Sequence, residues 1–414
     1  MRRGVIIGSI VALFVIQAII RFQSDIIHDA AWYLYVADGL LHGGHLYTDF
    51  IEVNPPLGMW LTLPVAWLGN LTALGPVKTT YIVLLGLTVL PLLLVTRYLR
   101  LMRDVPHAAR ALFCVVTAAV ILFMPAADFT EREHLVVLLF LPWPFLRLAR
   151  ARGARLGLLE ASFVGLMAAT AICIKPQSLL APLGVELVLQ LRYRNFRGLF
   201  APENIVAAVF AVLYGASILI FEPDFLGTIM NLGVKAYVPF YGYSNTTIWL
   251  FSIRSILLVV FAMLLWQRTD GPMADITALS AAVAGGFILS YFIQYKGFTY
   301  QLLPARIFAS LACAAAVSGI VAQMPFARWP SVPRFLAGSS ILIAAVDFGF
   351  HPQIYPNDGR VFEAGIARYA PGTRSIFIAS TRVSHGFPFT LNRNLVWASR
   401  LPAQWLTPYV ASKW

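Results

Sequence analysis

Apolar runs of 14 to 21 residues recur along the whole chain, and they strongly restrict how it can fold. A helix that crosses a hydrocarbon core about 30 Å thick needs about 20 residues, close to the length of these runs. The runs are residues 4–20, 77–96, 111–127, 135–148, 156–174, 178–191, 204–221, 248–266, 274–294, 302–322 and 335–350. Charged residues make up only 12% of the chain, against about 25% in soluble proteins. The pattern predicts an all-α polytopic membrane protein with about eleven transmembrane helices.

The basic residues gather in alternate loops, and this bias orients the predicted helices. The apolar stretch 55–74 is interrupted by prolines, so we treat it as a helix lying at the interface. Sixteen of the 31 Lys and Arg residues then fall on the inner side: Arg2, Arg3, Arg97, Arg100, Arg103, Arg110, Arg147, Arg150, Arg152, Arg155, Arg192, Arg194, Arg197, Arg268, Arg328 and Arg334. The net charge of +12 is therefore a topology signal, and no nucleic-acid partner is needed to explain it.

The first outer loop, residues 21–76, is far more polar than a connector between two helices requires. Its segment "HDAAWYLYVADGLLHGGHLYTDFIEVNPPLGMWL" carries Asp29, Asp38, Asp49 and Glu52. Asp29 stands where an outer helix begins, so it is either a catalytic carboxylate or an N-cap. Tyr33 follows one helical turn later and can share its face. Asp38 has the pattern of a solvated face, and Asp49 that of a turn residue.

A second acidic motif, "DFTEREHL" (128–135), lies on the same outer side after the third predicted span. It places Glu131, Arg132, Glu133 and His134 in succession. Ionisable groups beside the hydrocarbon cost about 2.5–3.5 kcal/mol each at a helix centre. Four such groups in one short loop favour a functional role over an ordinary polar connector.

Two further outer motifs each combine a lysine with polar side chains and a residue that ends a helix. They are "CIKPQSLLAP" (173–182), with Lys175 and Gln177, and "QYKGFTYQLLP" (294–304), with Lys296, Tyr300 and Gln301. The lysines can be interfacial anchors. A lysine beside a free helix end also suits an anionic phosphate. Carboxylates and lysines around one outer cavity would allow a carboxylate to deprotonate a hydroxyl while cations hold a departing phosphate.

The order of these motifs resembles the GT-C glycosyltransferases that use polyprenyl-phosphate sugars. This group includes the protein O-mannosyltransferases and the lipid A aminoarabinose transferase. The resemblance rests on "DAAWYLYVADGLLHGGHLYTDF", "NPPLGMW", the acidic motif and "KPQ", and it covers about residues 1–310. It implies a transmembrane GT-C-like domain over residues 1–350, with interfacial helices in the first outer loop. Residues 351–414 would form a small outer C-terminal α/β region, with a strand at 375–380.

The resemblance implies a polyprenyl-phosphate-linked sugar as donor, and a hydroxyl of a glycan, lipid or protein as acceptor. The family's first acidic position falls on Asp29, the expected base, and its second on Glu131 or Glu133. The basic position falls on Lys175. Asn54 stands where the aminoarabinose transferases have a lysine, which leaves Lys296 as a further phosphate-binding candidate. A divalent cation, Mg²⁺ or Mn²⁺, is left open as a cofactor.

For a Gram-negative host, this interpretation places the protein in the bacterial inner membrane with its active site facing the periplasm. Two alternatives remain. One is a glycan polymerase or ligase that uses a polyprenyl-diphosphate glycan, an enzyme class that usually has a large, basic late outer loop. Here the 222–247 loop carries Lys235 as its only basic residue. The other is a lipid or sugar transporter, which is expected to show two related halves.

Overall fold

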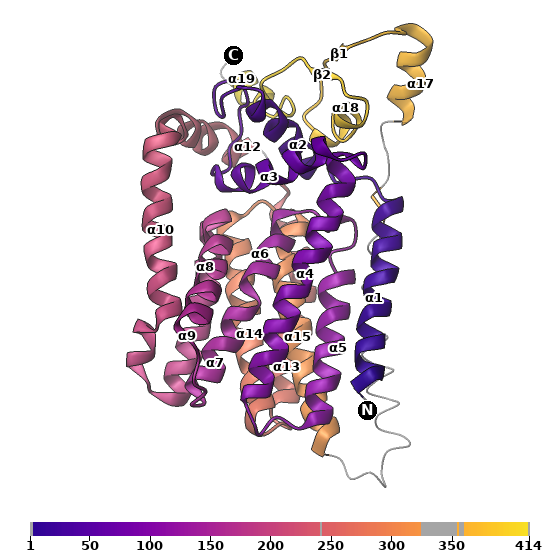
Figure 1. Ribbon diagram of the computed structural model, residues 1–414. Helices are drawn as coiled ribbons and strands as arrows, with labels where there is room; N and C mark the ends of the chain where they lie inside the picture. The colour runs from indigo at the N-terminus through magenta and orange to yellow at the C-terminus, as the bar shows by residue number, and fades with distance from the viewer. Residues whose placement is uncertain (1–2, 241, 324–353, 356–359, 413–414) are drawn as a thin grey trace.

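The computed structural model describes residues 3–240, 242–323, 354–355 and 360–412. It is a helical bundle with a small cap at one end (Figure 1). Within these described ranges, seven helical stretches are long and apolar enough to cross a membrane: Gly4–Gln23, Gly75–Leu101, Arg132–Ala151, Pro202–Phe221, Asn245–Trp266, Gly271–Gln294 and Thr299–Gln323. The prediction of a helical membrane protein is therefore confirmed, whereas the count of eleven spans stays a prediction.

Ten of the eleven predicted runs coincide with helices, and the run 335–350 lies outside the described residues. The helices of the bundle are α1 (Arg3–Gln23), α4 (Gly75–Leu101), α5 (His107–Phe123), α6 (Arg132–Phe140), α7 (Pro142–Ala151), α8 (Leu158–Ile174), α9 (Leu180–Tyr193), α10 (Pro202–Phe221), α13 (Asn245–Trp266), α14 (Gly271–Gln294) and α15 (Leu303–Gln323). Short 3-10 turns connect several of them: η1 (Ala126–Asp128), η2 (Pro176–Leu179), η3 (Phe196–Phe200) and η6 (Thr299–Leu302).

Two of the helix boundaries that differ from the prediction bear on the site. The α5 helix ends at Phe123 rather than continuing to residue 127, because Pro125 has no backbone N–H to continue the hydrogen bonds of the helix. The α6 helix begins at Arg132, so the acidic motif predicted as a loop supplies a helix start. Glu131 is the N-cap residue of that helix, and its side chain is therefore held at a fixed point of the bundle.

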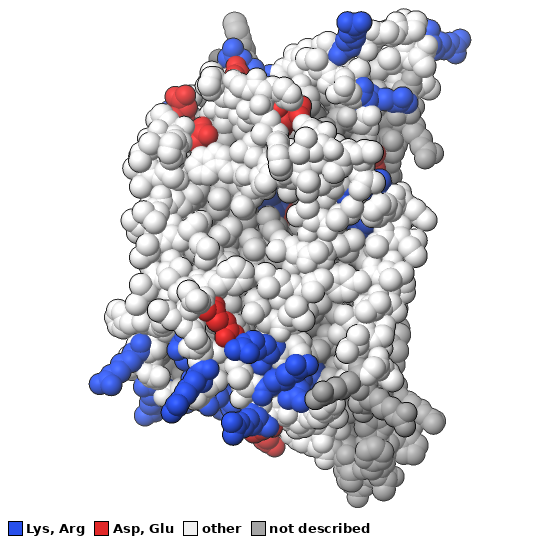
Figure 2. Space-filling view, in the orientation of Figure 1, with Lys and Arg blue, Asp and Glu red and all other residues white. Residues whose placement is uncertain are grey.

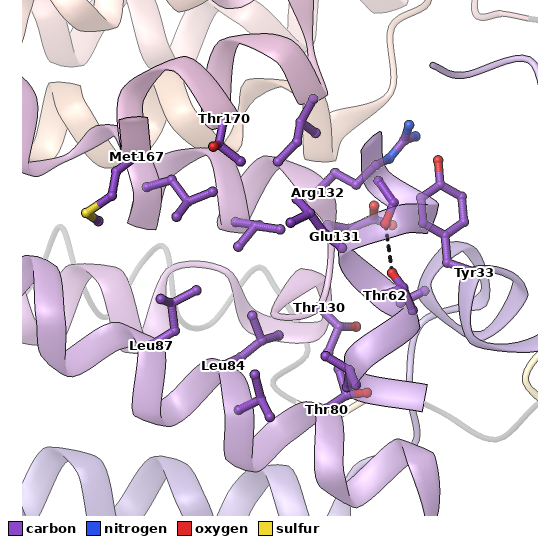
Figure 3. Close-up of a pocket in the computed structure, with 18 of the residues that line it drawn as sticks. Tyr33, Thr62, Thr80, Leu84, Leu87, Thr130, Glu131, Arg132, Met167 and Thr170 are labelled. Atoms are coloured by element: carbon purple, nitrogen blue, oxygen red, sulfur yellow. Dashed lines mark hydrogen bonds between the residues drawn. The ribbon is translucent and has the colours of Figure 1, made fainter. Parts of the chain in front are cut away.

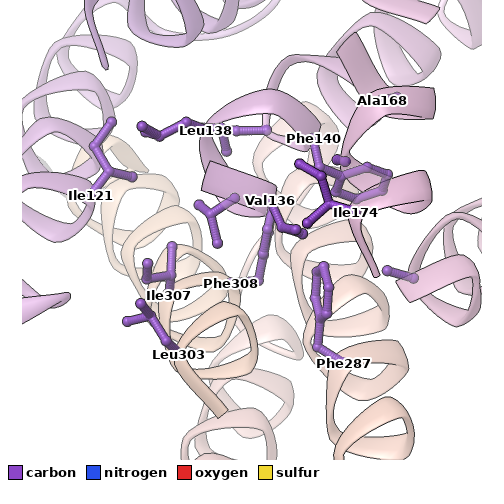
Figure 4. Close-up of a cluster of buried hydrophobic side chains, with 14 of the residues drawn as sticks. Ile121, Val136, Leu138, Phe140, Ala168, Ile174, Phe287, Leu303, Ile307 and Phe308 are labelled. Carbon is purple, nitrogen blue, oxygen red and sulfur yellow. The ribbon is translucent and has the colours of Figure 1, made fainter. Parts of the chain in front are cut away.

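Close packing between helices holds the centre of the bundle together. The rings of Phe140, Phe287 and Phe308, from α6, α14 and α15, lie 5.9–6.1 Å apart (Figure 4). A Cβ added to Gly286 of α14 would lie 2.6 Å from the Cα of Ala181 in α9. Small residues at helix crossings allow such close backbone approach, which drives helix association in lipid.

The basic loops share the lower end of the bundle, where Figure 2 shows the Lys and Arg side chains gathered. Arg147 donates to Glu186 at 2.7 Å and to Glu203 at 2.9 Å, and Arg150 also binds Glu203 at 2.8 Å. Glu203 is fully buried, so these cations compensate its charge. The described basic loops thus share one end of the fold, while Arg2, Arg328 and Arg334 of the prediction lie outside the described residues.

The opposite, outer end carries α2 (His28–Leu41) and α3 (Leu57–Leu71), which lie above the bundle (Figure 1). The 15 residues of α3 are fewer than the about 20 that a span requires. A further outer segment contains the π-helical turns η4 (Phe225–Ile229) and η5 (Gly233–Tyr237), with α11 (Met230–Leu232) and α12 (Val238–Phe240). All of the polar motifs identified in the sequence therefore lie at or near one end.

The C-terminal tail packs on the outer side of α2. Its elements are α17 (Arg360–Tyr369), β1 (Ser375–Ile376), η8 (Val383–His385), α18 (Phe389–Asn392), β2 (Val396–Trp397) and α19 (Thr407–Ala411). The predicted strand at 375–380 is present but short, pairing in parallel with β2. Phe387 contacts the ring of Trp32 at 5.3 Å, and the backbone N–H of Trp397 donates to Tyr35 at 2.9 Å. The tail therefore supports the face of α2 that carries Trp32 and Tyr35.

Candidate functional site

A cavity of about 410 Å³ opens between α2, α3, α4, α6 and α8 near the outer end. Its outer part is polar, and its inner part runs down between the helices along aliphatic side chains (Figure 3). The polar part is lined by Asp29, Tyr33, Thr62, Thr80, Thr130, Glu131 and Arg132. The apolar part is lined by Leu61, Val65, Val83, Leu84, Leu87, Leu90, Leu135, Leu139, Phe163, Leu166 and Met167. A cavity of this form suits a ligand with a polar head and an apolar chain.

Arg132 supplies the positive charge of the polar part. It lies in the first turn of α6, and its guanidinium carbon is 5.1 Å from the centre of the Tyr33 ring. Among the described residues, none of the ion pairs within 4.0 Å involves Arg132. A guanidinium on a cavity wall with no carboxylate bound to it is a ready site for a planar or tetrahedral anion.

Glu131 lies beside Arg132 but is almost completely buried, with 2% of its surface exposed. Its Oε1 atom has no hydrogen-bond partner within the described part of the chain. Burial raises the pKa of Glu131 well above its usual range, and the nearby charges of Asp29 and Glu133 raise it further. Burial therefore favours the neutral form of this carboxyl more than it would be favoured in an exposed glutamate.

Asp29 is the more accessible carboxylate of the cavity. Ile27 is the N-cap of α2 and Asp29 is the second helical residue, so its side chain projects from the first turn. About a quarter of the Asp29 side chain is exposed, and Asp29 lines the polar part of the cavity. Its Oδ1 lies 3.5 Å from Nε2 of His28. An accessible carboxylate on this wall is well placed to accept a proton from a bound hydroxyl.

Lys175 and Glu133 form a buried ion pair behind the cavity. The Lys175 ammonium donates to Oε1 of Glu133, and it also lies 5.7 Å from the centre of the Tyr300 ring. Burial lowers the pKa of Lys175, while the carboxylate of Glu133 partly offsets this effect. Neither residue lines the cavity. The charge of Lys175 is therefore balanced within the protein.

The other predicted phosphate-binding residues also lie away from the cavity wall. The Lys296 ammonium donates to the backbone carbonyls of Tyr237 at 2.7 Å and Val238 at 3.0 Å. It thereby fastens the segment that contains η5 and α12. Gln177 is half-buried in η2, and Gln301 is buried in η6 with no partner for its Oε1 atom among the described residues.

The residues predicted to have supporting roles separate into two groups. Tyr33 and Arg132 line the cavity, and the buried hydroxyl of Tyr33 has no hydrogen-bond partner within the described chain. Glu52 is buried and accepts a hydrogen bond from Nε1 of Trp32 at 3.0 Å, which fixes the loop on α2. Asp49 accepts from the backbone N–H of His45 at 2.8 Å and acts as a turn residue. His134 is buried, with its ring nitrogens 2.7 and 2.9 Å from the carbonyl oxygens of Phe129 and Ile121.

Four threonines of the cavity were not predicted from the sequence. Thr62, Thr80 and Thr170 lie on helices, and each hydroxyl donates to the carbonyl four residues earlier. Thr130 precedes the acidic pair, and its buried hydroxyl has no partner among the described residues. The hydroxyl of a threonine within an apolar helix usually bonds a carbonyl of its own helix, so no sequence signal distinguishes the first three. Thr130 lies inside the acidic motif, so it could have been predicted as a site residue together with Glu131 and Arg132.

The residue set was also tested against a divalent cation. Across the described residues, no three His, Cys, Asp or Glu side chains come together as a group that could hold a metal ion. Among the residues that the structure describes, Asp29 and Glu131 are the only carboxylates lining the cavity. The site therefore does not fit Mg²⁺ or Mn²⁺ held by protein ligands alone, and we derive no step through such an ion.

The fold and this cavity define a polytopic helical membrane protein with an amphipathic site at its outer end. No protein family, curated protein or solved structure was found to match the chain.

Proposed function

We propose that this protein is a membrane glycosyltransferase that moves a sugar from a polyprenyl-phosphate carrier to an acceptor hydroxyl. The observation that carries the proposal is the position of Arg132. Arg132, without an ion-pair partner among the described residues, lines the polar part of a cavity whose inner part is apolar. A polyprenyl-phosphate sugar has matching parts, since it joins an apolar chain, an anionic phosphate and a polar sugar.

The division of the cavity into a polar and an apolar part supports one orientation of the proposed donor. The isoprenoid chain would follow the aliphatic side chains of α3, α4, α6 and α8, among them Leu84, Leu87 and Leu135. Arg132 would bind the phosphate, because a guanidinium can donate two parallel hydrogen bonds to it. The sugar would then lie among Thr130, Glu131 and Asp29.

The reaction follows from the two carboxyl groups. Asp29 accepts the proton of the acceptor hydroxyl as its oxygen bonds to the anomeric carbon of the sugar. The bond from that carbon to the phosphate oxygen breaks, and the phosphate keeps the electron pair, balanced by Arg132. A positioned base contributes about 10²–10⁴ in rate. Glu131, in its neutral form, donates a hydrogen bond within the polar part. A single displacement of this kind inverts the anomeric centre.

The location of the reaction is part of the proposal. The cavity lies near the end opposite the basic loops, which the positive-inside rule assigns to the cytoplasmic side. In a bacterial inner membrane, the acceptor would then be a glycan, lipid or protein reached from the periplasm. Surrounding membrane lipids would meet the apolar flanks of the bundle.

The test is an analysis of lipid-linked sugars in cells that lack the protein. A glycosyltransferase predicts that one polyprenyl-phosphate sugar accumulates and that the wild-type gene removes it. Asp29→Asn should leave the donor accumulated, with turnover reduced by about 10² or more. Asp38→Asn is the matched control, because that carboxylate is nearly half exposed and binds Asn70 outside the cavity. Unchanged lipid-linked sugars, or full complementation by Asp29→Asn, would refute the proposal and favour a transporter.

A further inference from the structure

We propose that His28 and Tyr355 form a relay that positions Asp29 and carries its proton to a second cavity, between the end of α1, the start of α4 and the C-terminal tail. This inference rests on the proposed function, in which Asp29 is the base. It adds two residues, His28 and Tyr355, to the proposed site. Neither residue lines the cavity that contains Arg132 and Asp29, which we call the donor cavity.

The relay is visible as a chain of three side chains. Nε2 of His28 lies 3.5 Å from Oδ1 of Asp29, and Nδ1 of His28 lies 3.0 Å from the hydroxyl of Tyr355. The two nitrogens of one imidazole thus face a carboxylate and a phenol. The first distance is longer than a hydrogen bond, but contacts in ligand-free active sites are often long and tighten when substrate binds.

Tyr355 is held in place by the outer end of α1. Its backbone N–H donates to the hydroxyl of Ser24 at 2.9 Å, and it forms an antiparallel bridge with Asp25. The Tyr355 and His28 rings are 6.1 Å apart. These contacts come from a residue more than 300 positions later in the chain, so the C-terminal region completes the surroundings of His28.

A second cavity, of about 770 Å³, borders Tyr355. It lies between the end of α1, the start of α4 and the tail, and its walls include Ser24, Asp25, Lys78, Tyr355 and Asn392. Neither Asp29 nor His28 lines it. The lining of the second cavity is more polar than that of the donor cavity, so water can occupy it. The relay therefore connects the donor cavity to a wet cavity without passing through the donor.

The need for a relay follows from the donor's position. Asp29 borders the donor cavity, and a bound lipid and sugar would separate it from bulk water. After each transfer Asp29 holds the proton of the acceptor and must lose it. His28 takes this proton at Nε2, and the imidazolium releases its Nδ1 proton to the oxygen of Tyr355. Tyr355 passes its own hydroxyl proton to water, so one proton enters the chain and one leaves it.

The chain contains a matched control for this pair. His42 and Asp38 form a second His–Asp pair on the same helix, with 3.7 Å between Nδ1 and Oδ1. Their side chains are 73% and 46% exposed, and neither residue lines the donor cavity. A histidine that merely neighbours an aspartate on α2 should behave like His42.

The experiment compares His28→Ala, His28→Gln, Tyr355→Phe and His42→Ala as purified full-length proteins in detergent. The donor is the polyprenyl-phosphate lipid fraction extracted from cells that lack the protein, and membranes from those cells supply the acceptor. We expect His28→Ala to lower kcat about 10- to 100-fold, the usual effect of removing an outer partner of an active-site group. The KM for the donor should stay within a few-fold, because His28 lies outside the donor cavity. Added imidazole should restore part of the lost kcat.

The variants separate positioning from proton transfer. Glutamine can still form a hydrogen bond with Asp29 but cannot pass a proton through a ring, so His28→Gln should remain slow. Tyr355→Phe should lower kcat with an unchanged melting temperature, and His42→Ala should match the wild type. Full activity in His28→Gln or in Tyr355→Phe would overturn the relay, and Tyr355→Phe decides the matter if His28→Ala does not fold. If the relay is overturned in this way, the proposed function still stands, provided that the wild type transfers sugar and Asp29→Asn does not. No transfer by the wild type would refute the function itself.

Discussion

Two cations near the cavity should respond to substitution in opposite ways. Arg132 lines the cavity and has no ion-pair partner among the described residues, whereas Lys175 is buried against Glu133. Arg132→Gln therefore removes a group that would contact the ligand. Lys175→Met leaves a carboxylate buried without its counter-ion. The first change should weaken donor binding, and the second should lower the free energy of unfolding.

The expected magnitudes follow from the surroundings of each group. A hydrogen bond to a charged group is worth about 1.5–3 kcal/mol, so Arg132→Gln should weaken binding of a lipid phosphate about 10- to 150-fold. Breaking a buried ion pair from one side costs about 3–5 kcal/mol of stability. The double variant Lys175→Met with Glu133→Leu removes both charges. It should recover most of that loss, because well-packed apolar residues often replace such pairs at little cost.

Both quantities can be measured on protein purified in detergent. Farnesyl phosphate serves as the binding probe, titrated by calorimetry, and tryptophan fluorescence follows thermal unfolding. Arg132→Lys is the matched control, since it keeps the charge but loses the bidentate geometry of the guanidinium. Its affinity for farnesyl phosphate should lie between those of Arg132→Gln and the wild type. The contrary result is an equal loss of affinity in Lys175→Met and Arg132→Gln, with an unchanged unfolding temperature of Lys175→Met. It would show that the phosphate binds at Lys175, so the assignment made from the cavity would be wrong.

Three further predictions test the topology, the lipid path and a buried acid. Reporter fusions at residues 103 and 360 should report opposite sides of the membrane, and the same side for both would refute the assigned orientation. Leu84→Trp should fill the apolar part of the cavity, so it should weaken farnesyl phosphate binding while Leu93→Trp, on the exposed face of α4, does not. Burial raises the pKa of Asp128 to about 6, so the folded state holds this proton more tightly than the unfolded chain. Stability from this group is thus lost as the pH rises from about 4 to about 6, and Asp128→Asn should raise the melting temperature more at about pH 7.5 than at about pH 4.5.

The sequence alone determined the helices and the end of the fold at which the polar motifs lie. In lipid, each backbone polar group must be satisfied inside its own segment, so a long apolar run has little alternative to a helix. Alternate connections between such helices fall at alternate ends. This is why Asp29, Glu131 and Lys175 could be assigned to one end before any contact was known. Proline chemistry also sets the end of α5 near Phe123, a detail that the apolar pattern missed.

The tertiary structure decided which of these groups share a cavity. Lys175 and Glu133 are 42 residues apart and pair behind the cavity wall, while Lys296 binds carbonyls nearly 60 residues earlier in the chain. Arg132, adjacent to Glu133 in sequence, faces the cavity instead. The order of residues fixes the end of a helix on which a side chain lies, but not its neighbours from other helices. A charge is balanced or available according to contacts within about 4 Å, and helix packing alone sets those distances.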